Sequence, residues 1–178
     1  MELIKTDLLD FIKKRKSVRN FIYKKIDKEI ILECIDAGRY APSEGNSQPW
    51  HVCVVTHPTV KRMLSELSKD GGIIEEAYAN LVVFLDLERG FERIKDLQAI
   101  GAFMQNILLG VHAKEDLGAV WIGEIIGKKE KVNEIFKYSL EKYELMGIIA
   151  IGFTDEAREK ASKISRERRT VDEFVEWY

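Results

Sequence analysis

Proline and cysteine are scarce in this chain of 178 residues, which holds three prolines and two cysteines. So little proline, together with 46 % hydrophobic residues, is not typical of a disordered protein. Cys34 and Cys53 stand inside apolar runs and form neither a CxxC pair nor a cluster with histidine, so we expect no metal site. The composition predicts one compact domain with a full core.

A basic excess is also missing, because the formal net charge is −2. Nucleic-acid-binding proteins usually carry such an excess to displace counterions from phosphates, so we expect no nucleic-acid partner. No apolar run approaches the roughly 20 residues that cross a bilayer. The first residues, "MELIKTDLLDFIKKRK", do not have a signal peptide's order of charge, apolar core and small residues. A cytoplasmic protein without a membrane partner is the expectation.

Strands and helices alternate along the predicted fold. Four apolar segments predict strands, at residues 50–56, 80–86, 118–124 and 146–153. Helical periodicity, caps and breakers predict helices over residues 6–15, from 28 to the stop at Pro42, from Pro58 to the stop at Gly71 and Gly72, from Asp96 to Val111, and over 131–138. Several of these strands are apolar throughout, so helices should cover both faces of the sheet.

The segment "RKSVRNF" gathers donors for an anion. Arg15, Lys16 and Arg19 surround the hydroxyl of Ser17, just after a predicted helix. Guanidinium, ammonium and hydroxyl groups together suit a phosphate. The alternative is that basic residues at a helix C-terminus interact with the helix dipole and face water.

Two further polar clusters have less direct interpretations. In "APSEGNSQPWH", Asn46 and Gln48 precede Trp50, and amides of this kind can bond to the edge of a heteroaromatic ring. The alternative is a polar turn punctuated by prolines. In "RERRTV", near the C-terminus, the basic cluster consists of Arg166, Arg168 and Arg169, and the common interpretation of such a cluster is a solvated basic run.

Together the clusters resemble the FMN-dependent nitroreductase superfamily, over nearly the whole chain from about Asp7 to Trp177. The most specific match is "APSEGNSQPWHVCVV". "RKSVRNF" resembles the family's phosphate-binding signature, "DLQAIGAFMQNILLGVHAKEDLGAVWIGEI" its central helix and next strand, and "RRTVDEFVEW" its C-terminal arginine motif. The resemblance implies an α+β fold in which a mixed, largely buried sheet of four to five strands has helices on both faces. It also implies a C-terminal extension onto a partner subunit.

The resemblance implies FMN as the cofactor and gives a role to each motif. Residues 15–19 would hold the phosphate and ribityl chain or reach the pyrimidine edge of the ring. The loop at 42–46 would touch the flavin, commonly that of the other subunit, and residues 122–124 would offer backbone groups near N5. Arg168 would close on the phosphate, with Arg169 as the alternative. The implied cofactor-binding residues are Arg15, Lys16, Ser17, Arg19, Pro42, Ser43, Asn46, Ile122, Gly123, Glu124, Arg168 and Arg169.

One departure from the family pattern bears on the fold. Asp116 ends the central helix where many members have glycine. Aspartate tolerates the left-handed backbone conformation better than most residues, so we expect the turn to survive.

The expected chemistry belongs to the flavin, so we expect no catalytic side chain and no metal. His51, His57 and His112 fall in unrelated elements, and there is no GxGxxG stretch. A nicotinamide would therefore stack on the flavin and share one pocket with the acceptor, in a ping-pong scheme. We expect hydride transfer from NAD(P)H to FMN and then reduction of a nitroaromatic, quinone or related acceptor. The alternatives are a flavoprotein of the same fold with other chemistry, such as reductive dehalogenation or flavin fragmentation, and a non-catalytic FMN-binding or interaction module.

A homodimer is expected from the central helix and the tail. The helix is apolar or small nearly all round, with Gly101, Ala102 and Gly110, so one side would meet the sheet and another the same helix of a second copy. The tail "VDEFVEWY", residues 171–178, ends on aromatic side chains that need a partner surface. Both features predict a dimer with FMN at its interface. The alternative is a tail that folds back on its own domain.

Overall fold

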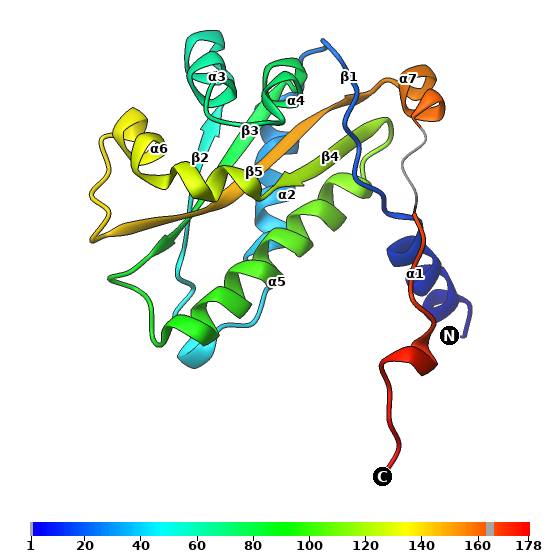
Figure 1. Ribbon diagram of the computed structural model, residues 1–178. Coiled ribbons are helices and arrows are strands. Elements are labelled where there is room, and N and C mark those ends of the chain that lie inside the picture. Colours follow the sequence, from blue (N-terminus) through cyan, green and yellow to red (C-terminus); the bar gives the residue numbers. More distant parts are fainter. Residues whose placement is uncertain (1, 163–165) are drawn as a thin grey trace.

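The computed structural model of the protein describes residues 2–162 and 166–178 (Figure 1). The helices are α1 (Glu2–Lys14), α2 (Lys28–Gly38), α3 (Pro58–Ser65), α4 (Gly71–Glu76), α5 (Arg93–His112), α6 (Lys129–Phe136) and α7 (Glu156–Ala161). The strands are β1 (Phe21–Ile22), β2 (Trp50–Val55), β3 (Ala79–Asp86), β4 (Leu117–Ile122) and β5 (Tyr143–Thr154). Short 3₁₀ turns, η1 (Glu44–Asn46), η2 (Glu124–Lys128) and η3 (Val171–Glu173), complete the elements. The expected α+β class is confirmed.

The sheet is built around β5, which pairs with β3 on one side and with β4 on the other. β1 pairs with the last residues of β5, beyond the point where β3 stops pairing with it. β2 pairs with β3 and forms the outer edge of the sheet. Every pairing among the described strands is antiparallel, so the expected mixed sheet is wrong in this detail. The crossover through α5 does leave β3 and β4 running in the same direction, but β5 lies between them and runs the opposite way.

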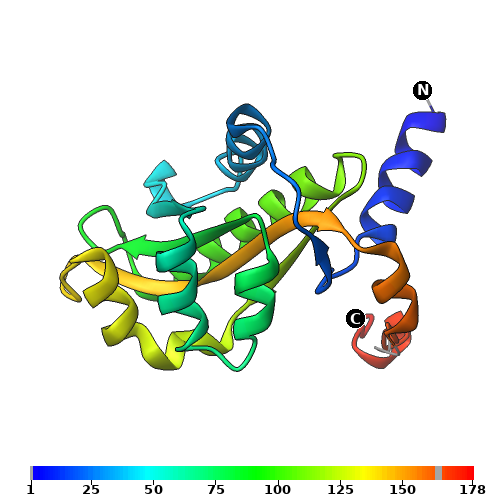
Figure 2. The same ribbon diagram turned by 90° about the horizontal axis from the view of Figure 1, so that it is seen from above.

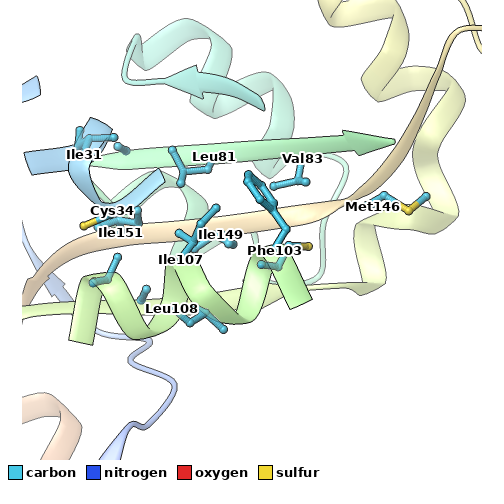
Figure 3. Packing of buried hydrophobic residues seen from close by; sticks show 14 of the residues in the cluster. Ile31, Cys34, Leu81, Val83, Phe103, Ile107, Leu108, Met146, Ile149 and Ile151 are labelled. Atoms are coloured by element: carbon cyan, nitrogen blue, oxygen red, sulfur yellow. The ribbon is translucent and has the colours of Figure 1, made fainter. Parts of the chain in front are cut away.

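Helices cover both faces of the sheet, as predicted. In both views α2 and α5 lie on one face and α3, α4 and α6 on the other (Figures 1 and 2). Leu81 and Ile149 belong to the core under α2 and α5, beside Phe103 of α5 (Figure 3). Their neighbours Val82 and Ile148 belong to the core on the opposite face. This alternation requires strands that are apolar throughout, because both faces exclude water.

A β-bulge at Gly147 shifts the alternation within β5. Met146 and Ile148 stand two positions apart but belong to opposite cores, and the β3–β5 register shifts between Val83 and Phe84. Gly147 has φ of 134°, and a Cβ there would lie 2.8 Å from Nε1 of Trp121. Glycine is therefore required at this bulge.

Two predicted helix boundaries are wrong. Gly71 does not end a helix but begins α4, where an added Cβ would lie 2.4 Å from the Ser65 carbonyl oxygen, so it is needed for the close approach of α3. The central helix begins at Arg93 because Glu92 accepts the N–H of Ile94 at 3.0 Å. Asp96 lies inside that helix and accepts the N–H of Phe91 instead.

The second buried side of α5 packs against α2 of the same chain. At this end of the helix, the expected contact with the same helix of a second copy is therefore wrong. A Cβ on Gly110 would lie 3.1 Å from the Ala37 Cβ, and one on Gly38 would lie 2.8 Å from Phe103 and Ile107. The small residues at this end of α5 therefore admit α2 rather than a second copy. Gly101 differs, because an added Cβ there meets nothing within 4 Å.

The C-terminal residues do not fold back onto the sheet. In both views the tail lies beyond the end of the sheet that carries α1 and α7 (Figures 1 and 2). Phe174 is 60 % exposed and Trp177 is 93 % exposed. No helix within the described ranges is both long and apolar enough to cross a membrane.

Candidate functional site

The first motif forms a strap, residues 15–20, which leaves α1 and crosses the start of β4 on its way to β1. Val18 is buried in the strap and donates its N–H to the Ala119 carbonyl at 3.0 Å. A Cβ on Gly118 would lie 2.6 Å from the Val18 Cβ, so glycine permits the close approach of the strap to β4. The residues on either side of Val18 are thereby held at the surface.

The strap and the C-terminal arginines meet in one cavity of about 290 Å³, which we call the anion pocket. It brings together two segments about 150 residues apart in the sequence. Its lining residues are Arg15, Lys16, Ser17, Arg19, Glu159, Ser162, Arg166 and Arg168. Five of these side chains are cationic and one is a carboxylate. Burial lowers the pKa of Arg15, and the charges of Arg168 and Arg166 lower it further, so the cations of the pocket repel one another. An anion would relieve this repulsion.

The three C-terminal arginines have different partners. Arg166 donates to the carbonyls of Lys14 and Arg15, at 3.3 and 3.1 Å, and so caps the end of α1. Arg168 lines the anion pocket. Arg169 turns away and pairs with Glu173 at 3.3 Å. Of the two arginines for which the resemblance implies a phosphate role, Arg168 lines the anion pocket and Arg169 does not.

The loop at 42–48 has a strained, internally bonded backbone. Gly45, Asn46 and Gln48 have φ of 56°, 56° and 48°, in the left-handed region. The Ser43 hydroxyl accepts the Gln48 N–H at 3.0 Å. Pro42 and Ser43 line a second cavity, of about 470 Å³, with Lys95, Gln98 and Ala99 of α5. The loop therefore presents a fixed surface at the N-terminal end of α5.

The third group, Ile122 to Glu124, lies where β4 ends and η2 begins. The Glu124 carboxylate turns toward the α3–α4 connection, where it accepts the Lys69 N–H at 3.0 Å and the Ser68 hydroxyl. A Cβ on Gly123 would have only Nε1 of Trp121 within 4 Å, at 3.8 Å. The backbone at Gly123 is thus open to a ligand, and the charged side chain of Glu124 is held elsewhere.

The predicted site residues thus form three groups along one chain. The anion pocket and the second cavity share no lining residue. Sequence reasoning did not include Glu159, Ser162 or Arg166 among the site residues. Arg166 could have been included, because it belongs to the basic cluster "RERRTV". Glu159 and Ser162 could not, because a single glutamate or serine in a charged stretch does not differ from its neighbours.

The three histidines stay apart, as expected. His51 bonds to the Tyr138 hydroxyl at 3.0 Å, His57 caps α3, and His112 packs on Phe11 with ring centroids 4.7 Å apart. Among residues 2–162 and 166–178, no three His, Cys, Asp or Glu side chains lie where they could hold a metal ion.

Comparisons with known proteins agree with one another. Residues 12–90 match the model of the "Nitroreductase family". "Putative NAD(P)H nitroreductase YfhC" of Bacillus subtilis is 30 % identical over 172 residues, which cover 85 % of this chain and 87 % of that protein. The "Putative NADH dehydrogenase/NAD(P)H nitroreductase" of Methanothermobacter thermautotrophicus is 32 % identical over 121 residues. Those residues are 67 % of this chain but 62 % of the relative, so the match spans less than two thirds of the relative's length.

A solved structure supports the same grouping over the whole fold. The crystal structure of "a putative nitroreductase in complex with fmn" from Desulfovibrio desulfuricans has a TM-score of 0.86 and 31 % identity, and covers 94 % of each chain.

Proposed function

This chain belongs to the nitroreductase family, and from that premise we propose that it is an FMN-dependent oxidoreductase. It takes a hydride from NAD(P)H and passes electrons to a nitroaromatic, quinone or related small acceptor. The observation that carries the proposal is the anion pocket, because it joins two motifs from opposite ends of the chain around one concentration of positive charge.

The residues of the anion pocket fit a phosphate monoester. Arg15, Lys16 and Arg19 of the strap and Arg168 of the tail offer charged donors, and Ser17 adds a hydroxyl. A phosphate dianion accepts several such bonds at once. It also offsets the repulsion by Arg168 and Arg166, which adds to the effect of burial in lowering the pKa of Arg15. Hydrogen bonds to charged groups typically contribute about 1.5–3 kcal/mol each. We assign this pocket to the FMN phosphate.

Ile122, the last residue of β4, and Gly123 would then hold the ring of FMN. From Gly118, beside the strap, to Ile122 the strand rises roughly 13 Å at 3.3 Å per residue. A ribityl chain and part of a ring span such a length. The flavin supplies hydride acceptance and electron donation when it is bound. The backbone at Gly123 would offer polar groups to the ring, and the Glu124 carboxylate would not add its charge there, because Ser68 and Lys69 hold it aside.

The loop at 42–46 belongs to the site of a second copy in this proposal. The strap lies near the C-terminal end of α5, since one cavity is lined by both His112 and Arg15. Pro42 and Ser43 lie at the other end, against Lys95. From residue 95 to residue 112 the helix rises roughly 25 Å at 1.5 Å per residue. One FMN molecule does not reach from the phosphate to this loop, so we propose a homodimer in which each loop completes the partner's ring site.

No protein side chain acts as an essential acid or base in the proposed reaction. Nicotinamide and acceptor occupy the exposed face of the ring in turn, in a ping-pong scheme. The chain's residues hold the phosphate, orient the ring and leave one face open. We place the reaction in the cytoplasm, with neither nucleic acid nor membrane as a partner.

The experiment is a flavin titration followed by anaerobic reduction. We expect the purified protein to be yellow, to bind one FMN per subunit and to prefer FMN to riboflavin by well over tenfold. NADH or NADPH should bleach the bound flavin without oxygen, and a panel of nitroaromatics and quinones should restore the colour. A colourless protein that does not quench FMN fluorescence would overturn the proposal. Bound FMN that neither NADH nor NADPH reduces would favour a non-catalytic flavin carrier.

A further inference from the structure

Glu159 is the single carboxylate among the cations of the anion pocket, and it holds the end of the strap. Its Oε1 atom accepts three hydrogen bonds, from the backbone N–H of Arg19 at 2.8 Å, the backbone N–H of Asn20 at 2.9 Å and the Asn20 side-chain amide at 2.8 Å. The partners are about 140 residues away in the sequence. Glu159 thus fixes two consecutive peptide groups of the strap.

The helix that carries Glu159 is itself anchored. Arg158 makes a two-pronged ion pair with Glu76 of α4, at 3.0 and 3.1 Å. Asp155 caps α7 by accepting the Arg158 N–H, and its own N–H donates to the Asn20 carbonyl at 3.0 Å. A continuous set of contacts therefore runs from α4 through α7 to the strap.

The carboxylate remains charged in this setting. Burial alone would raise the pKa of Glu159, but the N–H groups of Arg19 and Asn20 and the nearby charge of Lys16 outweigh it, and the pKa is lowered. A permanent negative charge beside an anion site opposes the ligand by Coulomb repulsion. A carboxylate at this position must therefore favour ligand binding in another way that outweighs the repulsion.

We propose that Glu159 is a positioning residue for phosphate recognition: by holding the backbone at Arg19 and Asn20, it presents the Lys16 and Arg19 side chains to the phosphate. This inference rests on the proposed function, since the ligand is the FMN phosphate. In this proposal, the FMN affinity gained by fixing the strap is larger than the affinity lost through Coulomb repulsion between the Glu159 carboxylate and the phosphate.

Two substitutions separate the effect of the Glu159 charge from the effect of its hydrogen bonds to the strap, because the two effects change FMN affinity in opposite directions. Glu159→Ala removes both the charge and the acceptor. If only charge mattered, FMN would bind more tightly; in our proposal it binds about tenfold more weakly, because the strap is released. Glu159→Gln removes the charge but keeps an amide oxygen that can accept N–H bonds, so FMN affinity should equal or exceed that of the wild type.

The measurement is the Kd of FMN and of riboflavin for each purified full-length variant, by fluorescence quenching. Riboflavin has no phosphate, so its Kd should change less than twofold in Glu159→Ala. Glu134→Ala is the control, because it removes an exposed carboxylate of α6 that does not line the anion pocket. If Glu159→Ala does not fold, Asn20→Ala removes one of the three donors and should weaken FMN, but not riboflavin, by a smaller factor.

The outcomes also distinguish this inference from the proposed function. A wild-type protein that binds FMN, with a Glu159→Ala variant that binds it equally or more tightly, overturns the positioning role alone. An equal weakening of FMN and riboflavin also overturns it, because the loss would then be general. A wild-type protein that binds neither FMN nor inorganic phosphate overturns both proposals.

Discussion

The two ends of the proposed FMN site differ in how much of each a single chain builds. At the phosphate end, the strap, α7 and the C-terminal arginines converge on one cavity and bond to one another. At the ring end, the loop at 42–46 and the backbone at 122–124 belong to separate surfaces, and the loop faces α5 rather than the anion pocket. A single chain thus brings the proposed phosphate ligands together. In our proposal, the ring contacts from the loop at 42–46 come from a second copy, and those from Gly123 come from the same chain.

This difference has a physical reason. Several cations are held close together only if the surrounding backbone fixes them against their repulsion, which requires contacts within the chain. A flat ring needs surfaces on its edges and one open face, and two subunits can supply these. We therefore expect changes at the phosphate end to act on FMN affinity in each subunit, and changes at the ring end to act through assembly.

The largest effect should come from removing two guanidinium groups at the phosphate end. The double variant Arg15→Ala/Arg168→Ala loses two charge-assisted contacts of about 1.5–3 kcal/mol each, so FMN should bind on the order of a hundredfold or more weakly. Riboflavin affinity should hardly change. Arg169→Ala is the control, because that side chain pairs with Glu173. Equal losses in Arg168→Ala and Arg169→Ala would contradict the assignment of the phosphate to Arg168.

Deleting residues 171–178 tests the ring end. The deletion removes exposed apolar side chains, among them Phe174 and Trp177, that we propose cover the partner. We expect weaker dimerisation in sedimentation equilibrium and about tenfold weaker FMN retention, since each 1.4 kcal/mol of lost contact costs a factor of ten. A truncated chain that stays dimeric with unchanged FMN affinity would show that the tail has no such role.

A smaller effect is expected from Gly101→Ala on the outer side of α5. Within one chain the added methyl meets no atom within 4 Å, and helix propensity favours alanine by about 1 kcal/mol. If this side packs against a second copy, the dimer dissociation constant should rise severalfold while thermal stability of the monomer does not fall. Gly72→Ala in α4 is the control, since it also meets nothing and should leave the dimer unchanged.

The smallest effect is expected at His112, which lies beside the phosphate end. Burial lowers its pKa and the charges of Arg15 and Arg166 lower it further, while a hydrogen bond with the Phe11 backbone raises it; the net shift is downward and favours the neutral imidazole. His112→Ala should leave anaerobic flavin reduction by NAD(P)H within about tenfold, because general acid–base residues typically contribute roughly 10²–10⁴. A thousandfold loss with FMN still bound would mean that the phosphate end takes part in the chemistry.

The sequence predicted the sheet better than the short helices. β3 and the middle of β5 are apolar throughout because helices cover both faces, and that requirement is visible residue by residue. β2 at the sheet edge and β4 are less fully buried, but their apolar runs were still long enough to predict strands. β1 has two residues and leaves no pattern. α4 was missed because Gly71 serves a close approach to Ser65, which depends on tertiary packing. Asp116 adopts the left-handed conformation expected of it, with φ of 63°.

The site was predictable where a motif carries its own chemistry. The strap and Arg168 combine cations and a hydroxyl in short segments, and the family resemblance predicts that both bind one phosphate. The structure brings them to one pocket. Glu159 lies in a charged stretch in which acidic and basic residues are mixed, and nothing in the sequence distinguishes it from the other acidic residues there. Its role depends on how α7 docks between α4 and the strap, and sequence spacing does not encode that docking.

The central place of β5 also bears on how the chain folds as it is synthesised. β5 spans Tyr143–Thr154, and β1, β3 and β4 all pair with it. Until those late residues emerge from the ribosome, β4 and β1 have no strand to pair with in this sheet. Contacts between distant parts of a chain form slowly and leave apolar segments exposed in the meantime. A nascent chain stalled before Tyr143 should therefore be protease-sensitive and recruit chaperones, and protection should appear in one step once β5 has been made.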